Sequence, residues 1–188
     1  MKVIRLSVIC ILVFLIYAAA AYAHRPVIVK NKSSKDNPVL VDEPEISWAY
    51  YGILEGEPHY YKIDSSQPFN LYVNILVPDF HPDGEPVLRH DMSFKIFAQD
   101  TLFYEGEGLN NDWHRFYEEY GRDHYYWGPE FDQNVKAGTY SVVVYNSLNS
   151  GKYALAIGKR EKFNFLSIMG AMMKAKHLDI WFFKETAK

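Results

Sequence analysis

The sequence predicts an all-β protein: an antiparallel β-sandwich or jelly roll followed by a C-terminal amphipathic helix. Three observations support this fold class. Tyr, Phe and Trp make up 16% of the 188 residues, and aromatic side chains favour strands. Apolar and polar residues alternate in several short runs, which is the period of a half-buried strand. After Gly158 the apolar residues change to helical spacing.

We predict that residues 1–23 are a secretory signal peptide. Lys2 and Arg5 precede an apolar stretch, and Ala21-Tyr22-Ala23 has the small-residue pattern of a cleavage site. Cleavage there makes His24 the first residue and changes the formal net charge from −3 to −5. The expected location is therefore secreted or periplasmic, and the negative charge argues against a nucleic-acid partner.

Residues 24–160 are expected to form the sandwich, with eight or nine short strands. The clearest alternation runs from Phe69 to Val77 and stops at Pro78, since proline cannot donate to a sheet. The turn-like Gln99-Asp100 predicts a hairpin. The other expected strands are Val39–Val41, Ser47–Leu54, His59–Ile63, Phe94–Ala98, Leu102–Glu105, Tyr140–Tyr145 and Tyr153–Ile157. Short strands in this number are typical of a sandwich or jelly roll.

Two segments lack a strand pattern. Residues 78–92 contain three prolines and a glycine and are expected to form a loop. Residues 106–128 are expected to form a long insertion rich in acidic and aromatic side chains. Loops of this length carry function more often than short ones.

Residues 161–188 are predicted to hold the amphipathic helix and a tail. The helix is expected from about Asn164 to Lys176, and a second apolar cluster follows at Leu178–Phe183. The apolar run is shorter than the ~20 residues that a bilayer span needs, so no transmembrane segment is expected in the mature chain. The helix can dock on the sandwich, which we favour, or make a peripheral membrane contact.

The end of the predicted sandwich resembles a known family. Lys136–Tyr145 followed by Ser150–Gly158 is similar to the final hairpin of the bacterial pre-peptidase C-terminal domain, with an "aGtYyvrV" strand, a turn containing glycine and a "YtLai" strand. Ile46–Leu54 followed by Glu57–Ile63 resembles the opening of that domain, although His59 stands where an aspartate is usual.

The chain is also similar to a group of uncharacterised exported proteins that begin with His-Arg-Pro after the signal peptide. Here these residues are His24-Arg25-Pro26, and Glu161-Lys162-Phe163 matches the group's step into a C-terminal helix. The resemblance to the pre-peptidase C-terminal domain covers about residues 39–158. It implies a jelly-roll-like sandwich without catalytic machinery, used as an accessory module for secretion, stability or polymer binding.

No catalytic activity is predicted. The sequence contains no Gly-x-Ser-x-Gly elbow, no His-Glu-x-x-His motif, no phosphate-binding glycine loop and no cysteine nucleophile in the mature chain. Glu118, Glu119 and Asp123 are carboxylates close in sequence, but on a polar loop they are expected to form a solvated acidic patch. A glycan-active enzyme is retained as a third alternative because of this acidic aromatic segment.

A metal site is the second functional hypothesis. The α-amine and imidazole of His24 would form a chelate that, with a further imidazole, suits copper in square-planar geometry. His59 and His124 are the first candidates for that imidazole. The histidines at 81, 90 and 114 are further candidates. The alternative is an ordinary polar terminus, in which Arg25-Pro26 leads into a strand.

The segment 106–128 supplies the candidate ligand surface. Aromatic faces beside carboxylates can hold a sugar, hard oxygen ligands can hold calcium, and the alternative is that the aromatics only cover the end of the sandwich. The candidate residues are Trp113, Tyr117, Glu118, Tyr120, Asp123, Tyr126 and Trp127. The predicted function is an exported, non-catalytic binding or structural module of the cell envelope that recognises a glycan or another envelope component, without an obligatory cofactor.

Overall fold

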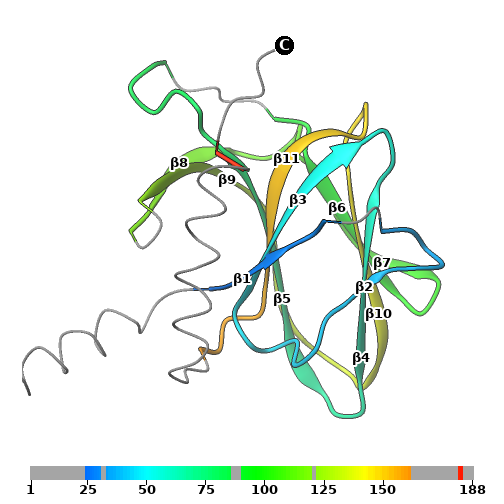
Figure 1. Ribbon diagram of the computed structural model, residues 1–188. Coiled ribbons are helices and arrows are strands. Elements are labelled where there is room, and N and C mark those ends of the chain that lie inside the picture. The colour runs from blue at the N-terminus through cyan, green and yellow to red at the C-terminus, as the bar shows by residue number, and fades with distance from the viewer. Residues whose placement is uncertain (1–23, 31–32, 86–89, 120–121, 162–181, 184–188) are drawn as a thin grey trace, which may run out of the picture.

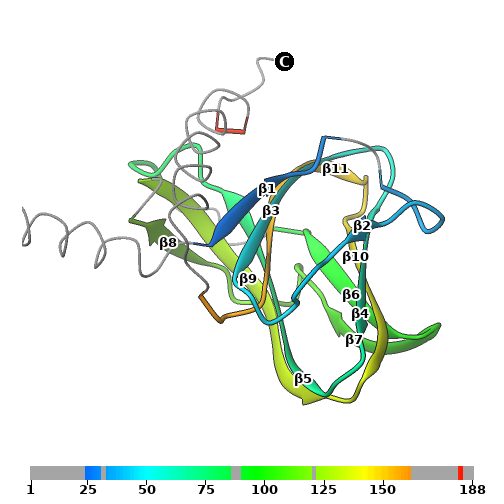
Figure 2. The same ribbon diagram turned by 60° about the horizontal axis from the view of Figure 1, so that its bottom comes forward.

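The computed structural model describes residues 24–30, 33–85, 90–119, 122–161 and 182–183. Within these residues the chain is all-β, and two sheets pack face to face as a sandwich (Figure 1). Figure 2 shows the same two sheets as separate layers, seen from the lower end. The sandwich fold class is therefore confirmed.

Eleven strands are present in the described part of the chain. The six-stranded sheet has, in spatial order, β1 (Arg25–Ile28), β3 (Trp48–Glu55), β11 (Ser150–Ile157), β5 (Phe69–Pro78), β9 (Asp123–Val135) and β8 (His114–Glu118). The five-stranded sheet has β2 (Val39–Leu40), β4 (His59–Ser65), β10 (Gly138–Tyr145), β6 (Ser93–Ala98) and β7 (Thr101–Gly106).

The core lies between the sheets and follows the predicted alternation. Leu71, Val73 and Ile75 of β5 are fully buried, and so are Val142 and Val144 of β10. Residues two apart on a strand point to the same side, so each strand places its apolar set against the other sheet. The expected inward direction of the β10 valines is confirmed.

The prediction of an antiparallel sandwich is wrong for two strand pairs, because both sheets are mixed. β1 pairs with β3 and β2 pairs with β4 in parallel, while the other strand pairs are antiparallel. Parallel neighbours need a long connection, and residues 29–47 and 41–58 provide one for each pair. The N-terminal segment thus covers one edge of each sheet.

The predicted long loop over residues 106–128 is wrong. About half of it forms β8 and the start of β9, which pair antiparallel from His114↔Trp127 to Glu118↔Asp123. Gly128-Pro129 looks like a strand break in the sequence, but β9 passes through it because the β5–β9 register shifts between Asn74 and Leu76. A bulge accommodates the irregular residues without ending the strand.

The two strands of the family resemblance do not form a hairpin. β10 belongs to the five-stranded sheet and β11 to the six-stranded sheet, so residues 146–149 cross from one layer to the other. The reason is burial. Val142 and Val144 of β10 and Leu155 and Ile157 of β11 are fully buried, and they enter the core from opposite sheets. In contrast, the predicted Gln99-Asp100 turn does join a hairpin, β6–β7.

The predicted helix at Asn164–Lys176 lies outside the described residues. Phe182 and Phe183 are described, and they contact the outer face of the six-stranded sheet, with ring centroids 5.1 Å from Tyr51 and 5.6 Å from Tyr125 respectively. Phe182 is fully buried. These two residues therefore dock on the sandwich. Within the described part of the chain no helix has the length and apolarity to cross a bilayer.

A buried polar network links the two sheets beside the core. The hydroxyl of Tyr153 on β11 lies 2.7 Å from Nδ1 of His59 and 2.6 Å from the hydroxyl of Tyr61, both on β4. Gly52 makes room for it, because a Cβ there would lie 2.5 Å from the Tyr153 hydroxyl oxygen. Buried polar groups in such a network stabilise the fold only while each keeps its partner.

We predict that acidification destabilises the protein through His59. Burial lowers the pKa of this imidazole, and the Glu55 carboxylate opposes the shift by less. The unfolded chain takes up the proton near pH 6.5 and the folded chain only at lower pH. The stability supplied by neutral His59 is therefore complete above pH 6.5 and is lost as the pH falls below it.

Urea unfolding near pH 7.5 and pH 5.5 checks this prediction. The wild type is expected to lose more free energy of unfolding between the two pH values than His59→Gln, whose amide can still bond to Tyr153 but does not titrate. His114→Gln, at an exposed position, serves as the matched control and should behave as the wild type. Equal losses in the wild type and His59→Gln would contradict the assignment.

Candidate functional site

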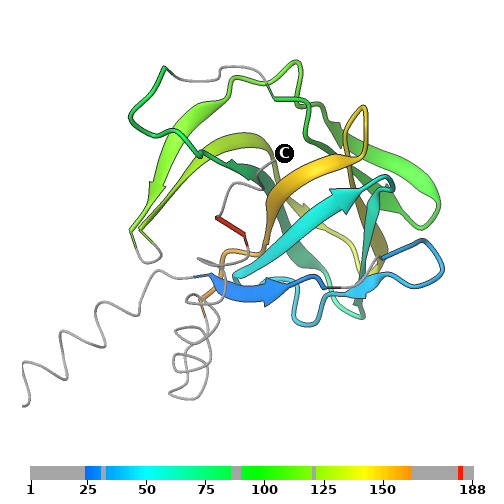
Figure 3. The same ribbon diagram turned by 45° about the horizontal axis from the view of Figure 1, so that its top comes forward.

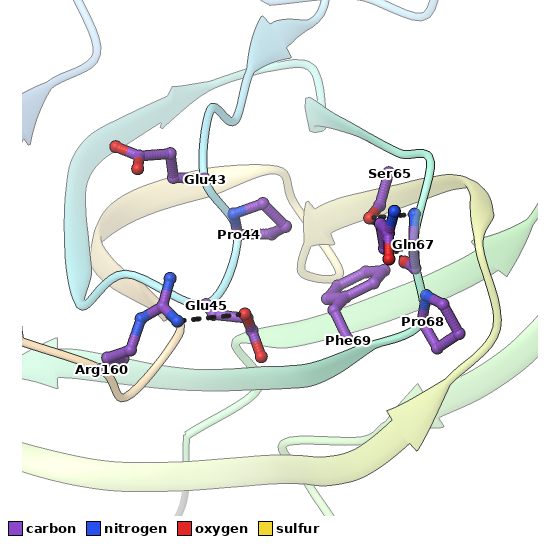
Figure 4. A pocket seen from close by; sticks show the side chains of 8 residues that line it. All are labelled: Glu43, Pro44, Glu45, Ser65, Gln67, Pro68, Phe69 and Arg160. Atoms are coloured by element: carbon purple, nitrogen blue, oxygen red, sulfur yellow. Dashed lines mark hydrogen bonds and ion pairs between the residues drawn. The ribbon is translucent and has the colours of Figure 1, made fainter.

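Two hollows lie at opposite ends of β5. The smaller one, of about 140 Å³, lies beside Phe69 at the start of the strand (Figure 4) and is lined by Glu43, Pro44, Glu45, Ser65, Gln67, Pro68, Phe69 and Arg160. The Glu45 carboxylate lies 3.6 Å from the Arg160 guanidinium and accepts a hydrogen bond from the Asn70 backbone N–H at 3.4 Å. Its size is below the range of roughly 300–1,000 Å³ typical of ligand pockets.

The larger hollow, the loop-end pocket, lies at the other end of β5 and has a volume of about 300 Å³. Three segments that are distant in sequence line it: the end of β5 with the residues after it, residues 90–92, and the β10–β11 connection with the start of β11. The yellow β10–β11 connection and the green loop after β5 lie at the same end of the molecule in Figure 1, which is turned forward in Figure 3. The lining residues are Val77, Pro78, Phe80, His90, Asp91, Met92, Asn146, Ser150, Gly151 and Lys152.

An aromatic ring and an ammonium group lie together in this lining. Phe80 is 37% exposed, which is high for a phenylalanine side chain, and Val77 and Met92 add buried apolar surface. Nζ of Lys152 lies 5.3 Å from the centre of the Phe80 ring, within the range of a cation–π contact. Burial lowers the pKa of Lys152, since a partly desolvated ammonium is less stable than one in water.

The carboxylate of Asp91 holds the β10–β11 connection in place. One oxygen accepts a hydrogen bond from the Asn146 amide at 3.3 Å, and the other accepts from the backbone N–H and the hydroxyl of Ser147 at 3.3 and 2.5 Å. Asn146 also bonds to both backbone groups of Ser150. These contacts shape one wall of the pocket.

The aromatic segment singled out in the sequence supports another lining residue, His90. The His90 ring packs against Trp113 and Tyr126, with centroid distances of 4.9 and 4.6 Å. The Trp113 indole N–H donates to the carbonyl oxygen of Gly108 at 2.8 Å, which orients the tryptophan. Trp113 and Tyr126 are not lining residues of the loop-end pocket. They pack against His90, which is one.

Arg115 on β8 fixes the loop that carries Phe80. Its guanidinium donates to the Asp79 carboxylate at 2.8 Å and to the carbonyl oxygens of His81 and Gly84 at 2.9 and 2.8 Å. The Asp79 side chain is only 3% exposed. A largely buried, hydrogen-bonded ion pair of this kind gives the loop a defined geometry.

The six predicted surface residues that the structure describes do not all lie on one surface. Trp113 and Tyr126 are buried in the core, at 4% and 2% exposure, whereas Tyr117 is 47% exposed and packs against His124. Trp127 packs against Phe116. Glu118 and Asp123 face each other across the β8–β9 pair, and Tyr120 lies outside the described residues. The strands decide this separation, because neighbours in a strand point to opposite faces.

The three predicted metal ligands lie on different elements. His24 precedes β1, His59 hydrogen-bonds with Tyr153 in the buried network, and His124 lies on β9. Among the described residues no group of three His, Cys, Asp or Glu side chains could hold a metal ion. Copper binding at His24 and calcium binding near the β8–β9 pair remain predictions.

Of the residues that line the loop-end pocket, sequence reasoning named only His90 as a functional candidate, as one histidine considered for a copper site. Phe80 lies in the proline-rich segment 78–92, which was expected to be a loop but was given no role. Lys152 stands directly before the predicted strand Tyr153–Ile157 and was also given no role. One signal could have pointed to both residues. Each lies beside a connection between strands, Phe80 after the strand Phe69–Val77 and Lys152 before the strand Tyr153–Ile157.

Comparisons with known proteins identify no family for the chain. No family model matches it, and no curated protein matches it. Among solved structures, it is similar to the pre-peptidase C-terminal domain of a collagenase from Bacillus anthracis, with 11% identity and a TM-score of 0.37, over 72% of this chain and 94% of that domain. At this TM-score the similarity carries no argument about function, so the family resemblance remains a prediction.

Proposed function

We propose that this protein is a non-catalytic binding module outside the cytoplasm, and that it holds a small ligand or one unit of a polymer in the loop-end pocket. The observation that carries this proposal is the pocket itself. It combines a partly exposed aromatic ring, apolar side chains and polar groups in one lining, and its size is at the lower end of the range of ligand sites. The location is inferred from the signal peptide predicted at residues 1–23.

The placement of the pocket supports binding. Its lining comes from connections at one end of a rigid sandwich, and such connections commonly carry recognition because the sheets hold them in fixed positions. Arg115 and Asp91 each anchor one of these connections through three hydrogen bonds. A site held in this way loses little conformational entropy when a ligand binds.

The chemistry of the lining favours a saccharide. A sugar ring offers C–H groups that pack on an aromatic side chain and hydroxyls that exchange hydrogen bonds with amide, hydroxyl and ammonium groups. Phe80 provides the aromatic surface, and Asn146, Ser150 and Lys152 line the same hollow. Asp91 is already engaged by three donors, which suits a structural role better than proton transfer.

Replacing Phe80 tests the proposal. We expect Phe80→Ala to weaken binding to a glycan identified on a glycan array by about tenfold or more, because removing a contacting phenyl ring costs roughly 1.5–3 kcal/mol. The melting temperature should change little, since the ring is partly exposed. Affinity is measured by isothermal titration calorimetry with the mature protein.

Leu102→Ala is the matched control. Leu102 is 49% exposed on β7, in the other sheet, and does not line the pocket. It should bind the glycan as the wild type does. If both variants bind with unchanged affinity, the ligand does not occupy the loop-end pocket and the proposed function is wrong in its site.

A further inference from the structure

We infer that the loop-end pocket selects an acidic saccharide, in which a uronate ring packs near Phe80 and its carboxylate pairs with the Lys152 ammonium. This inference rests on the proposed function and makes it more specific. It starts from the contact between these two side chains, which are far apart in sequence but share one hollow.

The lining contains one anionic and one cationic side chain, Asp91 and Lys152, and they make different contacts. Both oxygens of Asp91 accept hydrogen bonds from Asn146 and Ser147, so this carboxylate is directed toward the β10–β11 connection. Lys152 is instead positioned over the Phe80 ring, whose π-electrons stabilise the ammonium and orient it. A ligand carboxylate beside this ammonium would add a charge-assisted hydrogen bond to the cation–π contact.

The net negative charge of the protein does not oppose this selection at short range. The mature chain is predicted to carry −5, but at physiological ionic strength exposed charges more than about 8 Å apart are largely screened. A carboxylate within hydrogen-bond distance of Lys152 therefore responds mainly to that ammonium. The binding energy is expected to come from contact and not from long-range attraction.

The size and mixed character of the pocket argue for a uronate over a simple anion. About 300 Å³ is at the lower end of the range for ligand sites, which suits one sugar residue. Phosphate or citrate has no apolar face to pack on Phe80, whereas a uronate ring carries C–H groups and a carboxylate in one rigid unit. The lining offers an aromatic surface for the C–H groups and an ammonium for the carboxylate. The two lie about one sugar ring's width apart, since Lys152 Nζ is 5.3 Å from the Phe80 centroid.

Calorimetry with three probes tests the inference: an α-1,4-linked trigalacturonate, the neutral galactotriose of the same linkage, and citrate. The two trisaccharides differ only in carrying a carboxylate or a hydroxymethyl group at C6. We expect the trigalacturonate to bind at least about tenfold more tightly than galactotriose, the effect of one hydrogen bond to a charged group. Citrate should show no measurable binding, and added salt should weaken trigalacturonate binding.

Two substitutions at position 152 separate charge from shape. Lys152→Met keeps the length of the side chain and should reduce the affinity for trigalacturonate to that for galactotriose, while Lys152→Arg should retain the preference. Lys35→Met is the matched control, because Lys35 is a 77% exposed lysine in a surface ion pair with Asp100. It should leave binding unchanged.

The outcomes distinguish this inference from the proposed function. Equal affinity for both trisaccharides, or an unchanged preference in Lys152→Met, overturns the inference, and so does binding of citrate as tight as that of trigalacturonate. If Phe80→Ala still weakens binding in those cases, the proposed function survives with a neutral or different ligand. If no trisaccharide binds, the uronate inference is wrong, and the array with Phe80→Ala then decides the proposed function.

Discussion

Val144→Asp is expected to unfold the domain. Val144 is fully buried in β10, between the two sheets, and pairs with Phe94 and His59 on the neighbouring strands. An aspartate at this position would place an unpaired charge in the core, at a cost of several kcal/mol, against a total stability of roughly 5–15 kcal/mol. Circular dichroism during thermal unfolding should show a lost or strongly lowered transition.

Ser141→Asp is the control on the same strand. Ser141 points to the outer face of the five-stranded sheet, and its cross-strand neighbour on β4 is Lys62. A carboxylate there stays hydrated and gains an adjacent ammonium, so the melting temperature should change by only a few degrees. Similar melting temperatures for the two variants would show that the register of β10 is wrong.

Gly108→Ala is expected to damage both stability and ligand binding. A Cβ at Gly108 would lie 2.3 Å from the carbonyl oxygen of Met92 and 2.9 Å from that of His90. Because these are backbone atoms, residues 90–92 must move, and they line the loop-end pocket. We expect a loss of about 1–3 kcal/mol in the free energy of unfolding, the range for an overpacked site. Glycan affinity should fall in the same variant.

Gly56→Ala separates steric displacement from backbone strain. Gly56 has a φ of +95°, but nothing lies within 4 Å of the position that a Cβ would take. Alanine there is expected to cost about 1–2 kcal/mol because its backbone is strained, while leaving ligand affinity unchanged. If Gly108→Ala keeps full affinity at a temperature where it is folded, residues 90–92 do not shape the binding site.

The alternation of apolar residues predicted most of the sandwich because it is a local property. Phe69–Val77 and Tyr140–Tyr145 show a period of two, and each became a strand with the expected face buried. The same reasoning missed β8 and β9. Gly128-Pro129 interrupts the pattern, and the bulge that accommodates these residues depends on β5, which is more than forty residues earlier in the chain.

Local patterns predicted the strands of the sandwich, the inward face of β10, the β6–β7 hairpin and a loop after β5, because strand period and turn residues act between near neighbours. Three features became visible only in the folded chain: the sheets that β10 and β11 join, the packing of Trp113 and Tyr126 against His90, and the position of Lys152 over Phe80. These contacts join residues far apart in the chain. They follow from the packing of two sheets, which no local pattern of residues encodes.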